Sequence, residues 1–247
     1  MVIDVLHAPA EYAALVAQDL PDRVCVVFDV LRATSTLVTA LALGAASVRA
    51  VASIEQALKE RSRDPDCLLA GERGGLRIGA DQAGGVAFDL GNSPRELTRE
   101  RVFGRRIVMT TTNGTLALQA CARAKVVVAG AFLNLDAVAA HLQSMPDARV
   151  LLIGSGTGPE AAWEDSIAAG ALCDRLAGPG TELGDAAMLA MAAWRGVGAD
   201  LAGALGRGRN GRRLLAHPDL RDDVAWCAKR GCWSVVPTLD GTGAFIS

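Results

Sequence analysis

Short apolar runs rich in β-branched residues alternate with segments of helical hydrophobic spacing through the first two thirds of the chain. The apolar runs predict strands at residues 2–7, 24–30, 47–51, 67–71, 106–110, 125–129 and 149–155. The periodic segments predict helices at residues 10–18, 34–44, 54–62, 93–99, 112–122 and 134–143. Because strands and helices that alternate in this way build a helix-covered sheet, we expect a layered α/β/α fold with a mixed, largely parallel sheet.

The pattern changes near residue 160, after which alanine-rich helical segments dominate to about residue 229. Strand-like segments return only at 233–238 and 243–246. We predict a single unit over residues 1–247, with sub-lobes at 1–146 and 147–247. The joint between them is short and has no Gly/Ser linker, so the two lobes would pack closely.

Local signals add three details to this outline. Gly74 to Gly85 contains five glycines and predicts a mobile loop, whereas Gly203 to Gly211, with four glycines among arginines, predicts a basic turn region. The segment from Ser93 to Glu96 has the pattern of a capping box with proline at the first helical position, so it predicts the start of a helix.

Composition indicates a globular protein, because 247 residues with 51% hydrophobic content can bury a large core. The net charge is −2 and both signs are mixed along the sequence, which gives no reason to expect a nucleic-acid partner. The apolar stretches are too short or too interrupted to span a membrane, and Met1 to Asp4 lacks the basic region of a signal peptide. We therefore expect a cytoplasmic protein with reduced cysteines. The apolar, alanine-rich second part of the chain would permit a homodimer.

The segment from Cys25 to Thr36 carries the first candidate chemistry. Its apolar run ends at Phe28, and Asp29, Arg32 and three hydroxyl residues follow before the next predicted helix. Asp29 and Arg32 therefore fall in a strand-to-helix turn, which is where ligands bind in open α/β sheets.

Two further polar segments follow in the first half of the chain. Glu72 and Arg73 come directly after a predicted strand and beside glycines that allow close backbone approach. Asn92 and Ser93 precede a predicted helix whose free N–H groups would hold an anion. A surface ion pair and an ordinary helix cap are the structural alternatives for these two segments.

Polar residues also follow two later strands. Thr110, Thr111, Thr112, Asn113 and Gly114 offer converging hydroxyl and backbone donors, as a phosphate site without a Walker lysine requires. A glycine-rich turn after the strand at 149–155 leads to Glu164 and Asp165, which are candidates for metal ligation. The structural alternatives are a strand edge for the threonines and compensation of the helix dipole for the two acids.

Several standard catalytic motifs are absent from the sequence. It contains no Gly-Lys-Ser/Thr phosphate-binding loop, no Gly-x-Ser-x-Gly and no His-Glu-x-x-His. Val30 and Leu31 follow Asp29 in place of the second aspartate of haloacid-dehalogenase-type phosphatases. Cys67 and Arg73 have the C-x5-R spacing of cysteine phosphatases, which we interpret as coincidence because Cys67 begins an apolar strand.

Taken in order, the polar segments resemble those of the 2-phosphosulfolactate phosphatase family, also called ComB-like, over nearly the whole chain. The matching segments are 29–36, 71–73, 89–94, 110–115, 164–165 with 169–170, and 236–237. Five or more such segments in the same order are specific, whereas one alone would mean little. The segment 79–87 lengthens the glycine-rich link of the family pattern.

The resemblance implies the α/β fold of that family and a magnesium-dependent phosphatase that converts (2R)-2-phospho-3-sulfolactate into 3-sulfolactate and phosphate. This reaction is a step towards coenzyme M. The implied cofactor is Mg²⁺ and the implied partner is a small anionic phosphate ester. Two alternatives stay open: a phosphatase for another phosphorylated 2-hydroxy acid, and a non-catalytic binder of a phosphorylated or sulfonated acid.

Hydrolysis of a phosphate ester requires a positioned water and neutralised phosphoryl charge, so we assign expected roles on that basis. The expected catalytic residues are Asp29, Arg32, Glu72 and Arg73. The expected oxygen ligands of Mg²⁺ are Asp29, Glu72, Glu164 and Asp165. The expected substrate-binding residues are Asn92, Ser93, Thr110, Thr111, Thr112, Asn113 and Gly114. Asp29 is open to three roles: metal ligand, general base or nucleophile.

Overall fold

The computed structural model describes residues 1–15 and 20–247. Its strands are β1 (Val2–Leu6), β2 (Arg23–Phe28), β3 (Ser47–Ala50), β4 (Leu68–Arg73), β5 (Leu76–Arg77), β6 (Arg106–Thr110), β7 (Val126–Gly130), β8 (Arg149–Gly154), β9 (Glu182–Leu183), β10 (Thr238–Leu239) and β11 (Phe245–Ile246). Its α-helices are α1 (Pro9–Ala13), α2 (Ala33–Ala42), α3 (Ile54–Arg63), α4 (Arg99–Val102), α5 (Gly114–Ala120), α6 (Leu135–Gln143), α7 (Trp163–Leu176), α8 (Asp185–Arg195), α9 (Leu201–Arg207), α10 (Arg209–Ala216) and α11 (Arg221–Cys227). Single 3₁₀ turns are η1 (Ala80–Gln82), η2 (Pro94–Glu96) and η3 (Phe132–Asn134).

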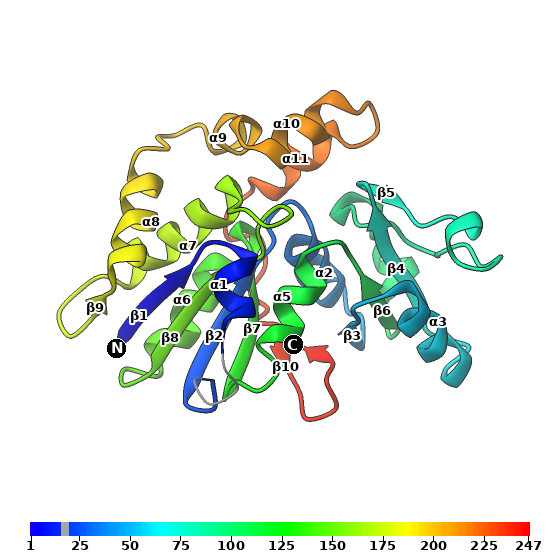
Figure 1. Cartoon of the computed structure of the whole chain (residues 1–247), viewed down its shortest axis with the longest axis horizontal. Helices are drawn as coiled ribbons and strands as arrows, with labels where there is room; N and C mark the ends of the chain where they lie inside the picture. The colour runs from blue at the N-terminus through cyan, green and yellow to red at the C-terminus, as the bar shows by residue number, and fades with distance from the viewer. Residues whose placement is uncertain (16–19) are drawn as a thin grey trace.

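These strands form one sheet in the order β5-β4-β6-β3-β11-β10-β7-β2-β8-β1-β9. Neighbouring long strands run parallel, whereas the hairpin β10–β11 lies antiparallel between β3 and β7 (Figure 1). Helices cover both sides of the sheet, so the predicted layered α/β fold with a mixed, largely parallel sheet is confirmed. The hairpin joins β4, β6 and β3 to the half of the sheet that contains β2 and β8.

Strand β2 shows why a continuous apolar run belongs at the centre of such a sheet. Val24, Val26 and Phe28 point into one hydrophobic core, which also contains residues of α6 and α7. Cys25 and Val27 point into a second core on the opposite side, which α2 and α5 cover. Both faces of the strand are buried, as is usual for parallel strands, and this explains the absence of alternating polar positions.

Four predicted elements differ from the observed ones. The helix predicted at 93–99 is replaced by η2 and the short helix α4, because the Ser93 hydroxyl donates to Asp223 and does not cap a helix. The basic turn region predicted at 203–211 consists of α9 and α10, which meet at Gly208. Of the strand predicted at 233–238, only Thr238 belongs to a strand, β10. The helix predicted at 10–18 corresponds to α1, which ends at Ala13, and residues 16–18 of that prediction lie outside the described residues.

The remaining organisation positions the candidate site. The predicted loop from Gly74 to Gly85 contains β5, which pairs antiparallel with β4, and η1. Helices α9, α10 and α11 form a cap over the carboxyl ends of the central strands, at the top of Figure 1 in orange. Strand β8 follows the predicted boundary at residue 147 and pairs with both β1 and β2, while the division into sub-lobes stays a prediction. Among the described residues, no helix has the length and apolar character needed to cross a bilayer.

Gly170 allows helices α7 and α8 to pack with their backbones in close contact. A Cβ atom added there would lie 2.0 Å from the carbonyl oxygen of Ala190, which belongs to the backbone of α8. We expect Gly170→Ala to lower the free energy of unfolding by about 1–3 kcal/mol, because α7 and α8 would have to separate. Denaturant unfolding measures the change. Gly241→Ala, where an added Cβ meets nothing within 4 Å, is the control, and equal stability of the two variants would contradict the expectation.

Candidate active site

Asp29 lies directly after β2, at the start of the turn that leads into α2. One of its carboxylate oxygens accepts a hydrogen bond from the Ala33 N–H at 3.0 Å, and its own N–H donates to the Thr34 hydroxyl at 3.0 Å. The peptide bond between Leu31 and Arg32 in this turn is cis. Burial raises the pKa of Asp29, the nearby charge of Glu72 raises it further, and the Ala33 hydrogen bond opposes the increase.

Arg32 is bound from two sides within the same turn. Its guanidinium donates to a carboxylate oxygen of Asp223 on α11 at 2.6 Å and to the Gly75 carbonyl at 2.5 Å. The other oxygen of Asp223 accepts from the Ser93 hydroxyl at 2.7 Å. Asp223 is fully buried and was not among the predicted site residues, whereas Ser93 supports it and does not line the pocket.

Glu72 connects two loops at the end of β4. One of its carboxylate oxygens accepts from the N–H and the hydroxyl of Thr112, at 2.9 and 2.8 Å. The other accepts from the Gly75 N–H at 2.7 Å. The Thr112 hydroxyl is thus already bonded within the protein, and the same holds for Thr111, which pairs with Thr115.

Arg73 lies beside the predicted site and does not line its pocket. Its guanidinium donates to the Glu72 carbonyl at 2.7 Å and to the Thr110 hydroxyl at 3.2 Å. The residue therefore holds the ends of β4 and β6 together. Gly114, at the start of α5, packs directly on Asp29: an added Cβ would lie 2.4 Å from a carboxylate oxygen of that residue.

The two acids at the start of α7 have different surroundings. Asp165 accepts hydrogen bonds from the Val30 N–H at 2.9 Å, the Ser155 hydroxyl at 3.1 Å and the Gly156 N–H at 3.2 Å, so it connects the turns after β2 and β8. Glu164 accepts from the Asn210 amide at 2.6 Å, and its second oxygen has no hydrogen-bond partner among the described residues. Burial is the main cause that raises the pKa of both carboxyls.

A pocket opens where these turns meet beneath the cap. It is lined by Asp29, Leu31, Arg32, Glu72, Gly75, Asn92, Thr112, Asn113, Gly156, Thr157, Gly158, Asn210 and Arg213. Six of the predicted site residues are among them, and the remaining predicted ones do not line the pocket. Asn210 and Arg213, both on α10, were missed: the predicted basic turn region 203–211 contains Asn210 and ends two residues before Arg213.

The oxygen atoms at this pocket suit a hard cation. No three His, Cys, Asp or Glu side chains come together as a metal site in residues 1–15 and 20–247, so the four predicted carboxylates are not one cluster. Asp29 and Glu72 do line the pocket, and Asn92 adds a side-chain carbonyl oxygen that is buried and has no partner there. Since Mg²⁺ is commonly held by one or two carboxylates together with substrate phosphate and water, these residues fit the ion.

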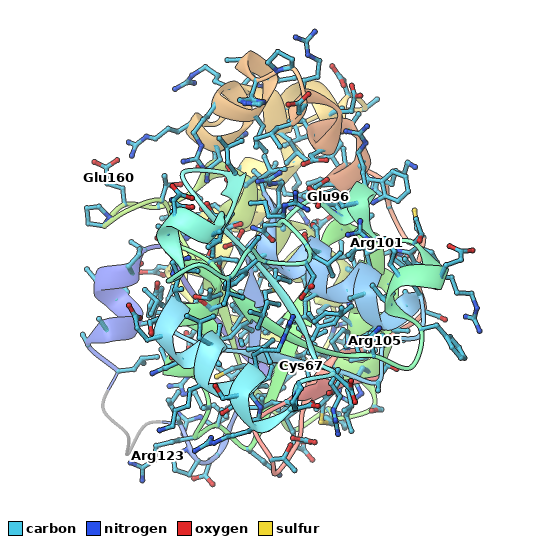
Figure 2. All side chains as sticks on the ribbon, turned by 90° about the vertical axis from the view of Figure 1, so that its right-hand side faces the viewer. Cys67, Glu96, Arg101, Arg105, Arg123 and Glu160 are labelled. Atoms are coloured by element: carbon cyan, nitrogen blue, oxygen red, sulfur yellow. The ribbon has the colours of Figure 1, made fainter. Side chains whose placement is uncertain are left out.

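Cys67 has the properties of a structural thiol. It is buried next to the start of β4, and burial raises the pKa of its thiol, which disfavours the nucleophilic thiolate. Figure 2 shows Cys67 in the lower half of the molecule, well below the cap helices. This placement agrees with the interpretation of its spacing to Arg73 as coincidence.

Comparison with known proteins identifies the relatives of this chain. Residues 2–242 match the family model described as 2-phosphosulpholactate phosphatase. A probable 2-phosphosulfolactate phosphatase of Synechococcus sp. (strain JA-3-3Ab) is 45% identical over 217 residues, which cover 86% of each chain. Proteins with the same description from Gloeobacter violaceus and Deinococcus radiodurans are 38% identical over 248 residues and 41% identical over 226 residues. These alignments cover 100% and 89% of this chain, and 98% and 90% of the respective relatives.

The pocket at the strand ends and these relatives together define a phosphoric monoester hydrolase. The chain belongs to the 2-phosphosulpholactate phosphatase family, and both the resemblance and the enzyme class predicted from the sequence are confirmed.

The raised pKa of Glu164 predicts a pH-dependent effect of its removal. A carboxyl with a higher pKa in the folded than in the unfolded state contributes stability at low pH, which is lost as the pH rises through the folded value. Glu164→Gln keeps an acceptor for Asn210 and removes the charge. In metal-free buffer we therefore expect the variant to melt at a higher temperature than the unmodified protein at pH 8, with the difference shrinking towards pH 5.

The matched control is Glu182→Gln, which makes the same change at an exposed position on β9. Thermal unfolding is followed for all three proteins across this pH range. A difference for Glu164→Gln that stays constant with pH would show that charge burial is not its cause.

Proposed function

We propose that this protein is a magnesium-dependent phosphatase that hydrolyses (2R)-2-phospho-3-sulfolactate to 3-sulfolactate and phosphate. The observation that carries the proposal is a pocket that combines the carboxylates of Asp29 and Glu72 with the guanidinium groups of Arg32 and Arg213. Relatives that align over most of the chain are described as probable 2-phosphosulfolactate phosphatases, which supports this choice of substrate. A purely anion-binding pocket would gain nothing from carboxylates beside a phosphate, because like charges repel.

Asp29 is the residue best placed to act on the attacking water. The Ala33 hydrogen bond fixes one of its oxygens, and the rigid end of β2 fixes its backbone. Its carboxylate lines the pocket, where it can act on a water held there. In this assignment Asp29 orients the water and accepts its proton as the new phosphorus–oxygen bond forms and the ester phosphorus–oxygen bond breaks. The leaving alkoxide oxygen of 3-sulfolactate then takes up a proton, from Asp29 or from solvent, to become its hydroxyl group.

The cation would be held by Asp29 and Glu72 together with the side-chain oxygen of Asn92. When bound, Mg²⁺ supplies neutralisation of charge on the phosphoryl oxygens and lowers the pKa of a bound water. Glu72 also keeps the loops at Gly75 and Thr112 in place, so its carboxylate orients the surrounding backbone whether or not the ion is present.

Arg32 and Asn113 complete the recognition of an anion. The Arg32 guanidinium is fixed by Asp223 and Gly75 at the edge of the pocket, so its N–H donors are oriented before substrate arrives, while its charge is balanced by Asp223. The Asn113 amide donates to the Gly156 carbonyl at 2.7 Å and so positions the start of α5 against the turn after β8. Preorganised charges and donors of this kind are the main contribution a protein makes to phosphoryl transfer.

Replacement of Asp29 tests the assignment of the acid–base group. We expect Asp29→Asn to lower kcat by at least ~100-fold, the scale of a lost general base, while circular dichroism shows an intact fold. Phosphate release from 2-phospho-3-sulfolactate is the measurement. Asp147→Asn, at an exposed position before β8, is the control. Near-normal turnover of Asp29→Asn would rule out a catalytic role for this carboxylate.

Removal of divalent cations tests the proposed cofactor. We expect EDTA to abolish phosphate release and added Mg²⁺ to restore it, because Asp29 and Glu72 repel an unshielded phosphate ester. The assay uses 2-phospho-3-sulfolactate beside 2-phospholactate and other 2-hydroxy-acid phosphates, which also tests the alternative substrates. Full activity in EDTA would exclude a required metal, and preference for another ester would reassign the substrate.

A further inference from the structure

The two arginines of the pocket differ in their ionic partners. Arg32 is 2.6 Å from the carboxylate of Asp223, and both side chains are almost completely buried, so this pair has no net charge. Arg213 is exposed at the pocket and forms no salt bridge or hydrogen bond with any residue of the described ranges. Of the two guanidinium groups, only that of Arg213 has its charge available for a ligand.

Helix α10 is anchored in a way that keeps Arg213 over the pocket. Asn210 lies three residues earlier and therefore on the same face of the helix. Its side-chain amide donates to the Thr157 hydroxyl at 2.7 Å and to Glu164 at 2.6 Å, and Leu214 is buried in the core. At the outer edge Arg209 pairs with Glu160, which projects sideways from the loop after β8, below the cap, in Figure 2.

The pocket therefore has two ends with different chemistry. Asp29, Glu72 and Asn92 come from the ends of the strands and form the end that suits a cation and the phosphoryl group. Asn210 and Arg213 come from the cap, which contributes no carboxylate to the lining. The carboxyl of Glu164, whose charge interacts with Arg213, is buried beneath Asn210 and does not line the pocket. An additional anionic group of the substrate, away from the phosphoryl group, would therefore meet Arg213 directly and no acid of the lining.

We propose that Arg213 binds the sulfonate of the substrate and so determines specificity for a sulfonated phosphate ester. A guanidinium group matches the oxygen geometry of such an anion with parallel N–H donors, and a sulfonate keeps its charge at any physiological pH. This inference rests on the proposed function, because it assumes that the phosphoryl group lies at the Asp29 end. It makes Arg213 a substrate-binding residue of the cap that takes no part in the proton transfer.

The test compares two esters that differ only in the sulfonate. Arg213→Gln, Arg213→Lys and the unmodified enzyme are assayed with 2-phospho-3-sulfolactate and with 2-phospholactate in the presence of Mg²⁺. We expect Arg213→Gln to lower kcat/KM for the sulfonated ester about 10- to 100-fold, mainly through KM, since a charge-assisted contact is lost. For 2-phospholactate, which has no sulfonate, kcat/KM should fall by a much smaller factor. Arg213→Lys should lower kcat/KM for the sulfonated ester less than Arg213→Gln does, because lysine keeps the charge and loses the parallel donors.

Arg212→Gln is the matched control, because Arg212 is exposed on the same helix and does not line the pocket. It should leave both esters unaffected. An equal loss with the two esters in Arg213→Gln would overturn the proposal, since the contact would then be to a group that both share. No loss with either ester would overturn it as well.

A binding measurement separates this proposal from the proposed function. Calorimetric titration compares 3-sulfolactate with lactate on the unmodified protein and on Arg213→Gln. We expect 3-sulfolactate to bind more tightly than lactate, and this preference to disappear in the variant. If the unmodified protein hydrolyses neither ester, the proposed function fails. A preference for 3-sulfolactate that depends on Arg213 would still support sulfonate binding in that case. If no such preference is found, the assignment of Arg213 to the sulfonate is overturned.

Discussion

The buried ion pair between Arg32 and Asp223 is the interaction on which the geometry of the pocket depends. It joins residues 191 positions apart and connects α11 to the turn that contains Asp29. Removing either partner would leave an uncompensated charge in the interior, and desolvating both charges offsets much of their attraction. We therefore explain the pair by its effect on geometry, because it holds α11 against the turn that contains Asp29, and not by a net gain in the stability of the fold. Through Ser93 it also fixes η2, so three separate segments share one carboxylate.

Two other carboxylates act in a similar way, as connectors between loops. Glu72 and Asp165 each accept hydrogen bonds from two segments that follow different strands. Tight turns such as those at Gly75 and Gly156 leave backbone N–H groups without partners in a strand or helix. A buried carboxylate supplies the hydrogen-bond acceptor that these groups need. The acid-rich character of this region is thus partly a consequence of its backbone geometry. Asp29 differs, because its carboxylate accepts a backbone hydrogen bond from Ala33 within its own turn and not from two separate loops.

The sequence was most informative where structure is decided locally. An apolar run that ends in a charged residue marks the end of a buried strand, and this is why Asp29, Arg32 and Glu72 could be placed at the pocket. Whether a hydroxyl or acid faces the ligand or a neighbouring loop depends on contacts between distant segments. The threonine hydroxyls and Asp165 were therefore predicted near the site, while their bonding within the protein was not foreseeable. Arg213 and Asp223 lie on short helices of the cap. No local sequence pattern predicts that these helices pack over the strand ends, so neither residue could be assigned to the site from the sequence.

The hairpin β10–β11 has a consequence for how the sheet is completed. Before residues 238–246 are in place, β3 and β7 are unpaired along one side, and each presents free N–H and C=O groups at the edge of a half-sheet. Such edges can also pair with a strand from another molecule. Proteolysis just before residue 238 would thus do more than shorten the protein: it would expose two strand edges for intermolecular pairing and make the fold aggregation-prone.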